Sequence, residues 1–324
     1  MILWAQGVVS ALRDSWAGAV RLEVEMKDQR VIPALAYLDV VGEPVVGDRV
    51  LLNTSAYQRS LGTGGFALVV ALPDRLPVRQ PQPGHLVKAR YTPLQSMVLG
   101  VDDQESPHHD VLRDADSLAG MPVVAADLHS SLPAVLAGIR AQPGGEDLTV
   151  AYVMTDGGAL PAAFSASCAG LRAAGWLSSV ITTGQSFGGD FEAVTVHTGL
   201  LAARHVVGAD IAVVTQGPGN LGTGTRWGFS GVALGEALNA TSILNGHGIA
   251  ALRISAADER PRHRGVSHHN HTAYGRVLMR PTDLVIPDMN GCEGVGVAFA
   301  RDVQSQAGEL LAQAPHLRGV GVRC

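Results

Sequence analysis

The pattern that most constrains this fold begins at Ser96, where apolar β-branched runs start to alternate with alanine-rich segments. Such runs are typical of strands buried on both faces of a parallel sheet, and the segments between them are typical of connecting helices. The sequence therefore predicts an α/β domain with a parallel sheet of six or seven strands flanked by helices. We expect strands at 97–101, 122–126, 149–154, 178–182, 210–215, 250–254 and 283–286, and helices at 133–140, 161–174, 191–207, 229–244 and 268–278.

The N-terminal residues follow another pattern. Residues 1–72 contain short runs of β type, such as 20–24 and 49–53, separated by turn signals, and they predict a small β-barrel-like domain. Prolines then recur between positions 73 and 93, where they disfavour both helix interiors and central strands. We therefore expect a linker at 73–95 and a ligand-binding α/β domain at 96–324.

Composition excludes several classes of function. A net charge of −5 with 5% aromatic residues is not the signature of a nucleic-acid-binding protein. No apolar run approaches the roughly 18 residues of a membrane span. The three cysteines and the absence of a secretory leader favour the cytoplasm. Lys27 and Lys88 both precede residue 96, so we expect no Schiff-base or Walker A lysine in the α/β domain.

The loops that follow the predicted strands are polar and glycine-rich. Because ligands bind beyond the carboxyl ends of parallel strands, we expect these loops to form one site. The ligand-binding candidates are Thr155, Gly157, Gln185, Ser186, Gln216, Gly217, Gly219, Asn220, Gly222, Thr223, Gly224, Thr225, Arg226 and Ser267. The catalytic candidates are His129, Asp156, His268 and His269.

Two of these loops match short motifs in the wrong context. Residues 217–222 match GxGxxG, but Pro218 removes an amide and the helix begins late, which disfavours a dinucleotide site. A nest of amides for a carboxylate or phosphate, with Arg226 adding charge, fits the loop better. Residues 184–188 match the GxSxG nucleophile elbow, yet the next helix begins too far from Ser186 for that motif.

The histidine-rich segment 268–271 carries the most chemistry. Ser267 is a plausible N-cap that would place His268 and His269 in the first helical turn. These histidines fit general acid/base work, metal binding or a structural helix start. The sequence does not decide whether a metal is bound, and it identifies no cofactor.

Three stretches together, 61–66, 217–231 and 265–269, resemble a bacterial family catalogued as a domain of unknown function. The resemblance covers nearly the whole chain and implies no substrate, cofactor or catalytic residue.

The first functional hypothesis is an enzyme acting on a small anionic metabolite, with the Gly/Thr-rich loop holding the anion and His268 or His269 transferring protons, assisted by Asp156. A metal-dependent hydrolase is a variant of it. The alternative is a protein that binds the ligand as a sensor or scaffold without transforming it. Small residues on the predicted helix 229–244 leave room for a homo-oligomer contact.

Overall fold

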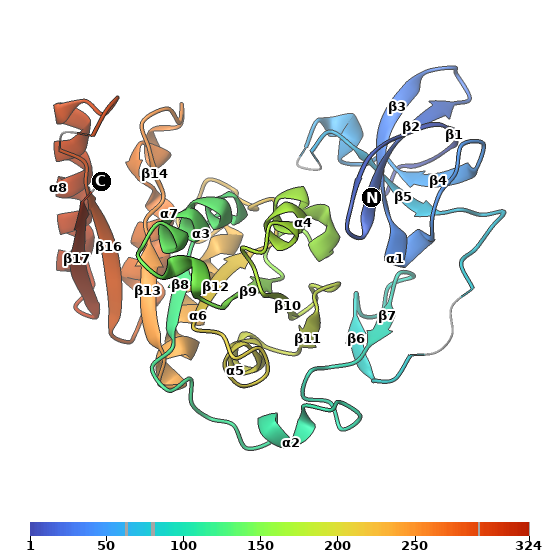
Figure 1. The fold of residues 1–324 in the computed structure, drawn as a ribbon. Coiled ribbons are helices and arrows are strands. Elements are labelled where there is room, and N and C mark those ends of the chain that lie inside the picture. The colour runs from blue at the N-terminus through green and yellow to red at the C-terminus, as the bar shows by residue number, and fades with distance from the viewer. Residues whose placement is uncertain (62–63, 79–81, 291, 324) are drawn as a thin grey trace.

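A closed barrel of five strands forms the N-terminal part of the molecule (Figure 1). The structure, a computed structural model, describes residues 1–61, 64–78, 82–290 and 292–323. The barrel closes in the order β1-β2-β3-β5-β4, and the predicted small β domain is confirmed. Its elements are β1 (Trp4–Trp16), β2 (Ala19–Met26), β3 (Val31–Tyr37), α1 (Leu38–Val41), β4 (Arg49–Asn53) and β5 (Ala67–Ala71).

The barrel forms because its strands alternate apolar and polar side chains. In β2 the side chains of Leu22 and Val24 are buried in the barrel core, while the intervening Glu23 reaches the surface and pairs with Arg13. Trp16 at the end of β1 donates its indole Nε1–H to the carbonyl of Ala163, which fastens the barrel to the α/β part. Residues 62 and 63 of the predicted 61–66 motif lie outside the described residues.

Eight parallel strands form the central sheet, in the order β11-β10-β9-β12-β8-β13-β16-β17. The β11 end of the sheet faces the barrel side of the molecule in Figure 1, and β17 lies at the opposite end. The predicted parallel α/β fold is confirmed, with eight strands. They are β8 (Pro122–Ala125), β9 (Val150–Thr155), β10 (Ser179–Thr183), β11 (Phe191–Ala193), β12 (Ile211–Gln216), β13 (His247–Ala251), β16 (Thr282–Asp288) and β17 (Leu317–Arg323).

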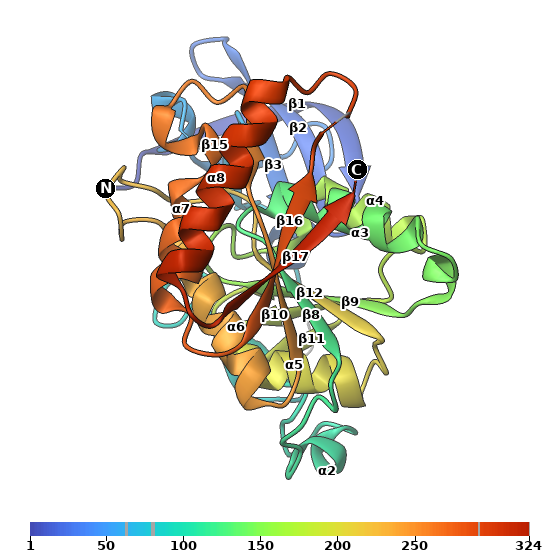
Figure 2. The same ribbon diagram turned by 90° about the vertical axis from the view of Figure 1, so that its left-hand side faces the viewer.

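Helices cover both faces of this sheet. On one face, α3 and α4 pack on a core that contains Tyr152 and Val213. On the other face, α5, α6 and α8 pack on a core that contains Val153 and Val214, and Figure 2 shows α8 in front of the β16–β17 end. None of the helices in the described part of the chain is long and apolar enough to cross a membrane. The helices are α2 (His109–Leu112), α3 (Leu132–Arg140), α4 (Ala166–Ala173), α5 (Val196–His205), α6 (Ala233–Ile243), α7 (His268–Thr272) and α8 (Val297–Gln313).

Several predicted elements differ from the structure. The predicted strand at 97–101 is β7 (Ser96–Val98), which pairs antiparallel with β6 (Leu86–Lys88) outside the parallel sheet. The predicted helix at 191–207 begins instead as β11, and α5 starts only after Thr195, whose hydroxyl caps it. A strand of three residues is too short to show a period of two, so the sequence did not reveal β11.

Lys88 precedes residue 96 in the sequence, yet its side chain reaches the α/β part, while the expectation of no Schiff-base or Walker A lysine there stays a prediction. The β6–β7 hairpin carries Lys88 into the carboxyl ends of β10 and β11, where its Nζ lies 2.7 Å from the carbonyl oxygen of Ser186 and 3.2 Å from Glu192 Oε2. The lysine is fully buried, and burial lowers its pKa. Its donors are occupied by this network, which also includes the carbonyl of Gly184, so Lys88 anchors the segment after the barrel.

The strand order places a topological switch between β8 and β12. These two strands are neighbours, but β8 connects through α3 to β9 on one side, while β12 connects through α6 to β13 on the other. In open parallel sheets such a point opens a crevice beyond the carboxyl ends of the strands, and ligands bind there. The residues after β8, β12 and β13 are therefore the first place to look for a site.

Candidate functional site

Asp127, which follows β8, is the centre of a buried polar network at this switch point. Its Oδ2 lies 2.9 Å from His269 Nδ1 and 3.3 Å from a guanidinium nitrogen of Arg253. Its Oδ1 accepts a hydrogen bond of 3.1 Å from Asn220 Nδ2, and its backbone oxygen accepts one of 3.0 Å from Gln216 Nε2. Asp127 thereby joins the loops after β8, β12 and β13 to α7.

The helix α7 brings two histidines to this network. Ser267 is its N-cap, because the serine Oγ accepts a hydrogen bond from the backbone N–H of His269. Tyr274, one turn beyond, donates its buried hydroxyl to the carbonyls of Ala125 and Ala251, at the ends of β8 and β13. The helix is therefore fixed to the carboxyl edge of the sheet, as the sequence predicted for Ser267 and His269.

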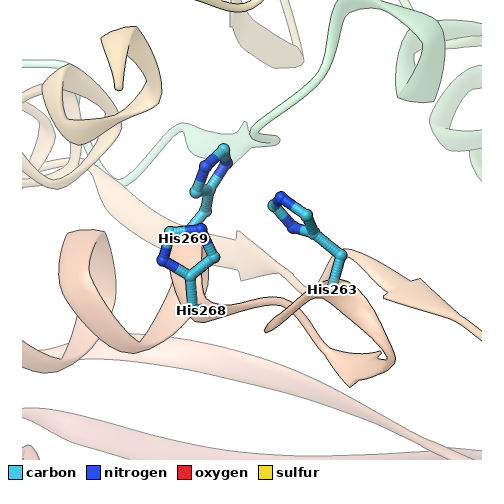
Figure 3. Close-up of side chains that lie close together, drawn as sticks. All are labelled: His263, His268 and His269. Atoms are coloured by element: carbon cyan, nitrogen blue, oxygen red, sulfur yellow. The ribbon is translucent and has the colours of Figure 1, made fainter. Parts of the chain in front are cut away.

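A third histidine, His263, lies beside these two. It belongs to the 3-10 turn Pro261–His263 before strand β15 (Gly265–Val266), and its ring faces the rings of His268 and His269 in Figure 3. One ligand nitrogen from each of the three imidazoles lies within 4.8 Å of the other two. The centroids of the His268 and His269 rings are 4.5 Å apart, and Phe229 stacks on His269 at 3.8 Å.

The second nitrogen of two of these rings is held by a neighbour. His269 Nδ1 lies 2.9 Å from Asp127 Oδ2, and a neutral imidazole that donates to this carboxylate keeps the lone pair on Nε2. His263 Nδ1 lies 2.8 Å from Ser267 Oγ, which can accept from it. His268 Nε2 is buried and has no hydrogen-bond partner in the described part of the chain.

Two histidines of the cluster, His263 and His268, are poorly disposed to carry a proton. Burial lowers the pKa of His268 to about 4, and the neighbouring His269 and Arg262 act in the same direction. Burial also lowers the pKa of His263 to about 4, with a further contribution from Arg253. Both imidazoles are therefore neutral at pH 7, the form in which histidine binds metal ions.

Residues 222–229 form a small hairpin against the histidine cluster. Thr223 N–H donates to the Gly228 carbonyl at 2.7 Å, and Gly222 pairs with Phe229, whose ring stacks on His269. The backbone oxygen of Arg226 accepts a hydrogen bond of 3.1 Å from Thr272 on α7. The Gly/Thr-rich loop predicted from the sequence therefore lies next to the histidine cluster.

Comparison with known proteins identifies the family. The family model described as "Protein of unknown function (DUF3866)" matches residues 33–316. The chain belongs to the DUF3866 family. No curated protein matches this DUF3866 chain significantly.

One solved structure matches part of this chain. It is the hydrogenase maturation factor HypB from Archaeoglobus fulgidus, with 12% identity and a TM-score of 0.32 over 66% of this DUF3866 chain and 85% of HypB. At this score the likeness carries no functional argument.

Two further predicted loops of the DUF3866 chain meet each other away from the histidines. Asp156 Oδ2 accepts a hydrogen bond of 2.9 Å from the backbone N–H of Gln185, and Thr155 holds Gly217 through its carbonyl at 3.1 Å. Ser186 is fully buried, and its Oγ has no partner among the described residues. Asp156, Gln185 and Ser186 therefore pack the β9 and β10 loops and have no hydrogen bond to the cluster.

Three other predicted residues have structural contacts. Gly157 leaves no room for a side chain, because a Cβ there would lie 2.5 Å from Gln216 Oε1. Gly219 has a φ of +90°, which favours glycine, and it leads the chain into Asn220. Thr225 Oγ1 accepts a hydrogen bond of 3.1 Å from the Gly228 N–H and lies 3.2 Å from Thr223 Oγ1, so these two hydroxyls stabilise the hairpin.

His129 of the DUF3866 chain belongs to the core beneath α3 and α4. Its Nδ1 lies 3.0 Å from the Tyr152 hydroxyl and its Nε2 lies 2.6 Å from Ser165 Oγ. Burial lowers the pKa of His129 to about 4. Both ring nitrogens are occupied, so the structure gives His129 a packing role and no contact with His269.

The sequence prediction missed Asp127, Arg253 and His263 of the DUF3866 chain. Asp127 directly follows a predicted strand, and this position was the signal that could have found it. His263 lies in the mixed-charge run 258–264, which favours a solvated loop, although His263 is 2% exposed.

A separate apolar cavity of about 500 Å³ beside α3 is lined by Val124, Ile139, Ile249 and Val285, among others, and by none of the cluster histidines.

Proposed function

We propose that this chain is a metal-dependent hydrolase in which His263, His268 and His269 hold a divalent transition-metal ion such as Zn²⁺ through their Nε2 atoms. The observation that carries the proposal is the convergence of three imidazoles, two buried and that of His268 partly buried, whose ligand nitrogens lie within 4.8 Å of one another. Three protein ligands with one open position are the usual arrangement of catalytic zinc sites.

The surroundings of the cluster support metal binding. Asp127 holds the Nδ1–H of His269, which is the carboxylate–histidine pairing found behind metal ligands. Ser267 can hold His263 Nδ1 in the same way. In a tetrahedral zinc site the ligand nitrogens are about 3.3 Å apart. The ligand nitrogens lie within 4.8 Å of one another, so metal binding would require the three side chains to draw closer together.

Proton transfer by the histidines alone fits the site less well. A general acid or base works best with a pKa near the working pH, and burial lowers the pKa of His268 to about 4. The same neutral imidazole is a good metal ligand. A bound metal ion would supply hydrolytic chemistry by acidifying water at neutral pH. In this account Asp127 and Ser267 orient the ligands, while Phe229 closes one side of His269.

The experiment that tests the proposal measures metal-dependent turnover. The chain is freed of metal with a chelator, reloaded with Zn²⁺, Co²⁺ or Mn²⁺, and assayed against chromogenic carboxylic esters, amides and phosphate esters. We expect turnover in one class with metal, none without it, and none in His263→Ala, His268→Ala or His269→Ala.

His247→Ala is the matched control. His247 pairs with Asp283 at 2.9 Å, as His269 pairs with Asp127, but at the amino ends of β13 and β16. This variant should keep both metal and turnover. Turnover that survives chelation or the loss of all three cluster histidines would overturn the proposal. Metal binding without turnover of any substrate would favour the alternative, a protein that binds its ligand as a sensor without transforming it.

A further inference from the structure

Two arginines beside the histidine cluster have no side-chain partner among the described residues. Arg226 lies in the 222–229 hairpin and Arg262 immediately precedes His263, and both side chains are exposed. In the described ranges of the chain neither guanidinium makes a hydrogen bond or an ion pair. By contrast, Arg253 and Arg260 are both neutralised by Asp258, and Arg253 also pairs with Asp127. Arg226 and Arg262 therefore contribute unneutralised positive charge beside the site.

The fold brings these two arginines to the same turn. A Cβ at Gly224 would lie 3.9 Å from a guanidinium nitrogen of Arg262, so this side chain reaches over the hairpin two residues from Arg226. The hairpin is itself attached to the cluster, through Phe229 on His269 and through the Arg226 carbonyl to Thr272. The hairpin, with the Arg262 side chain close to its Gly224, therefore lies beside the histidine cluster.

The turn also offers free backbone donors. The N–H groups of Gly224, Thr225 and Arg226 donate to no acceptor in the part of the chain that the structure describes. Gly224 has a φ of +80°, a conformation that lets successive N–H groups point toward an anion. Guanidinium groups and a backbone nest are the donors that proteins use for phosphate oxygens.

We propose that the substrate is a phosphate monoester whose phosphoryl group lies between Arg226, Arg262 and the metal held by the histidine cluster. The proposal rests on the proposed function and names its substrate class. A divalent ion and two guanidinium groups exceed the charge of a single carboxylate, whereas a phosphate monoester carries about −1.5 to −2 at neutral pH. Each of its three non-bridging oxygens can face one of these positive groups.

The reaction is hydrolysis of the ester. The oxygen of water forms a bond to phosphorus and the bond between phosphorus and the ester oxygen breaks. The leaving oxygen takes up a proton that the water loses, and the products are an alcohol and inorganic phosphate. No oxidant, reductant or further reactant is required.

The test measures the binding of inorganic phosphate, the product, to the zinc-loaded chain by calorimetry, with metal content measured in parallel. We expect Arg226→Ala and Arg262→Ala each to weaken phosphate binding about tenfold or more, because each removes a charged hydrogen-bond donor. Zinc content should not change in either variant. Arg280→Ala, an exposed arginine at the amino edge of the sheet, should bind phosphate as the wild type does.

Each other outcome has a defined meaning. If zinc is bound but phosphate does not bind, or binds equally well to both arginine variants, the substrate class is wrong and the metal site stands. If acetate binds as tightly as phosphate, the site recognises a carboxylate and the inference is overturned. If the wild type binds no metal, the proposed function itself fails.

Discussion

Replacing Asp127 with Asn tests the orientation of the metal ligands. Asp127 Oδ2 accepts from His269 Nδ1 at 2.9 Å, which fixes the proton on Nδ1 and leaves the Nε2 lone pair for a metal. An asparagine amide that faces His269 would donate to Nδ1 instead. The proton of the neutral imidazole would then move to Nε2, and His269 could no longer bind the ion there.

The magnitude follows from the contacts of Asp127. Loss of an outer partner of a metal ligand lowers affinity by about 10- to 100-fold, and the change of tautomer places Asp127→Asn at the upper end. The substitution also leaves the partly buried Arg253 with Asp258, at 3.5 Å, as its one remaining ion-pair partner among the described residues. Breaking a buried ion pair costs about 3–5 kcal/mol of unfolding free energy. Because Asp258 still pairs with Arg253, we expect a loss of about 3 kcal/mol.

Zinc affinity is measured by competition with a chromogenic chelator, and stability by urea unfolding of the metal-free protein. Asp283→Asn is the matched control, because Asp283 pairs with His247 and with Arg318 at the other edge of the sheet. The control should lose stability but keep zinc affinity. Wild-type zinc affinity in Asp127→Asn would refute the reasoning about the tautomer.

Three further predictions concern stability. Ser267→Ala removes the cap of α7 and should cost about 1 kcal/mol together with some zinc affinity, whereas Thr195→Ala at the cap of α5 should lower urea stability alone. Burial lowers the pKa of His129 to about 4, so the folded chain holds this histidine neutral more strongly than the unfolded chain does. As pH falls from 6.5 to 4, the free energy of unfolding should therefore decrease by about 3 kcal/mol. Urea unfolding of His129→Gln across this range should lack that loss. Lys88→Met leaves Glu192 buried without its cation and should cost about 3 kcal/mol or more in thermal and urea unfolding, and Glu192→Leu in the same chain should restore most of it.

Each of these has a contrary result. Equal loss of zinc affinity in the Ser267 and Thr195 variants would show that the cap acts only through global stability. An unchanged pH dependence in His129→Gln would mean that other groups account for the acid sensitivity. Full stability in Lys88→Met would show that Glu192 is protonated or hydrated without the lysine.

The parallel sheet could be predicted because its strands are buried runs. Residues 150–155 and 211–216 are almost entirely buried in β9 and β12, so apolar β-branched composition marks them directly. The sequence did not reveal β17, where glycines at 319 and 321 weaken the pattern. The number of strands therefore exceeded the expected six or seven, while the class of fold was confirmed.

The site could be predicted only in part. Ser267, His268 and His269 are neighbours in sequence, and the capping pattern was enough to place them on a helix start. His263 joins them through a turn, and Asp127 joins them across 142 positions of the chain. Contacts of that kind depend on strand order, which the sequence pattern does not give.

Anomalous diffraction from crystals of the zinc-loaded protein, measured at the zinc absorption edge, tests the central claim most directly. The account predicts one strong peak at about 2.0–2.1 Å from the Nε2 atoms of His263, His268 and His269, with Asp127 still bound to His269 Nδ1. A zinc-loaded crystal with no peak between the three imidazoles, or with zinc bound only elsewhere, would contradict it.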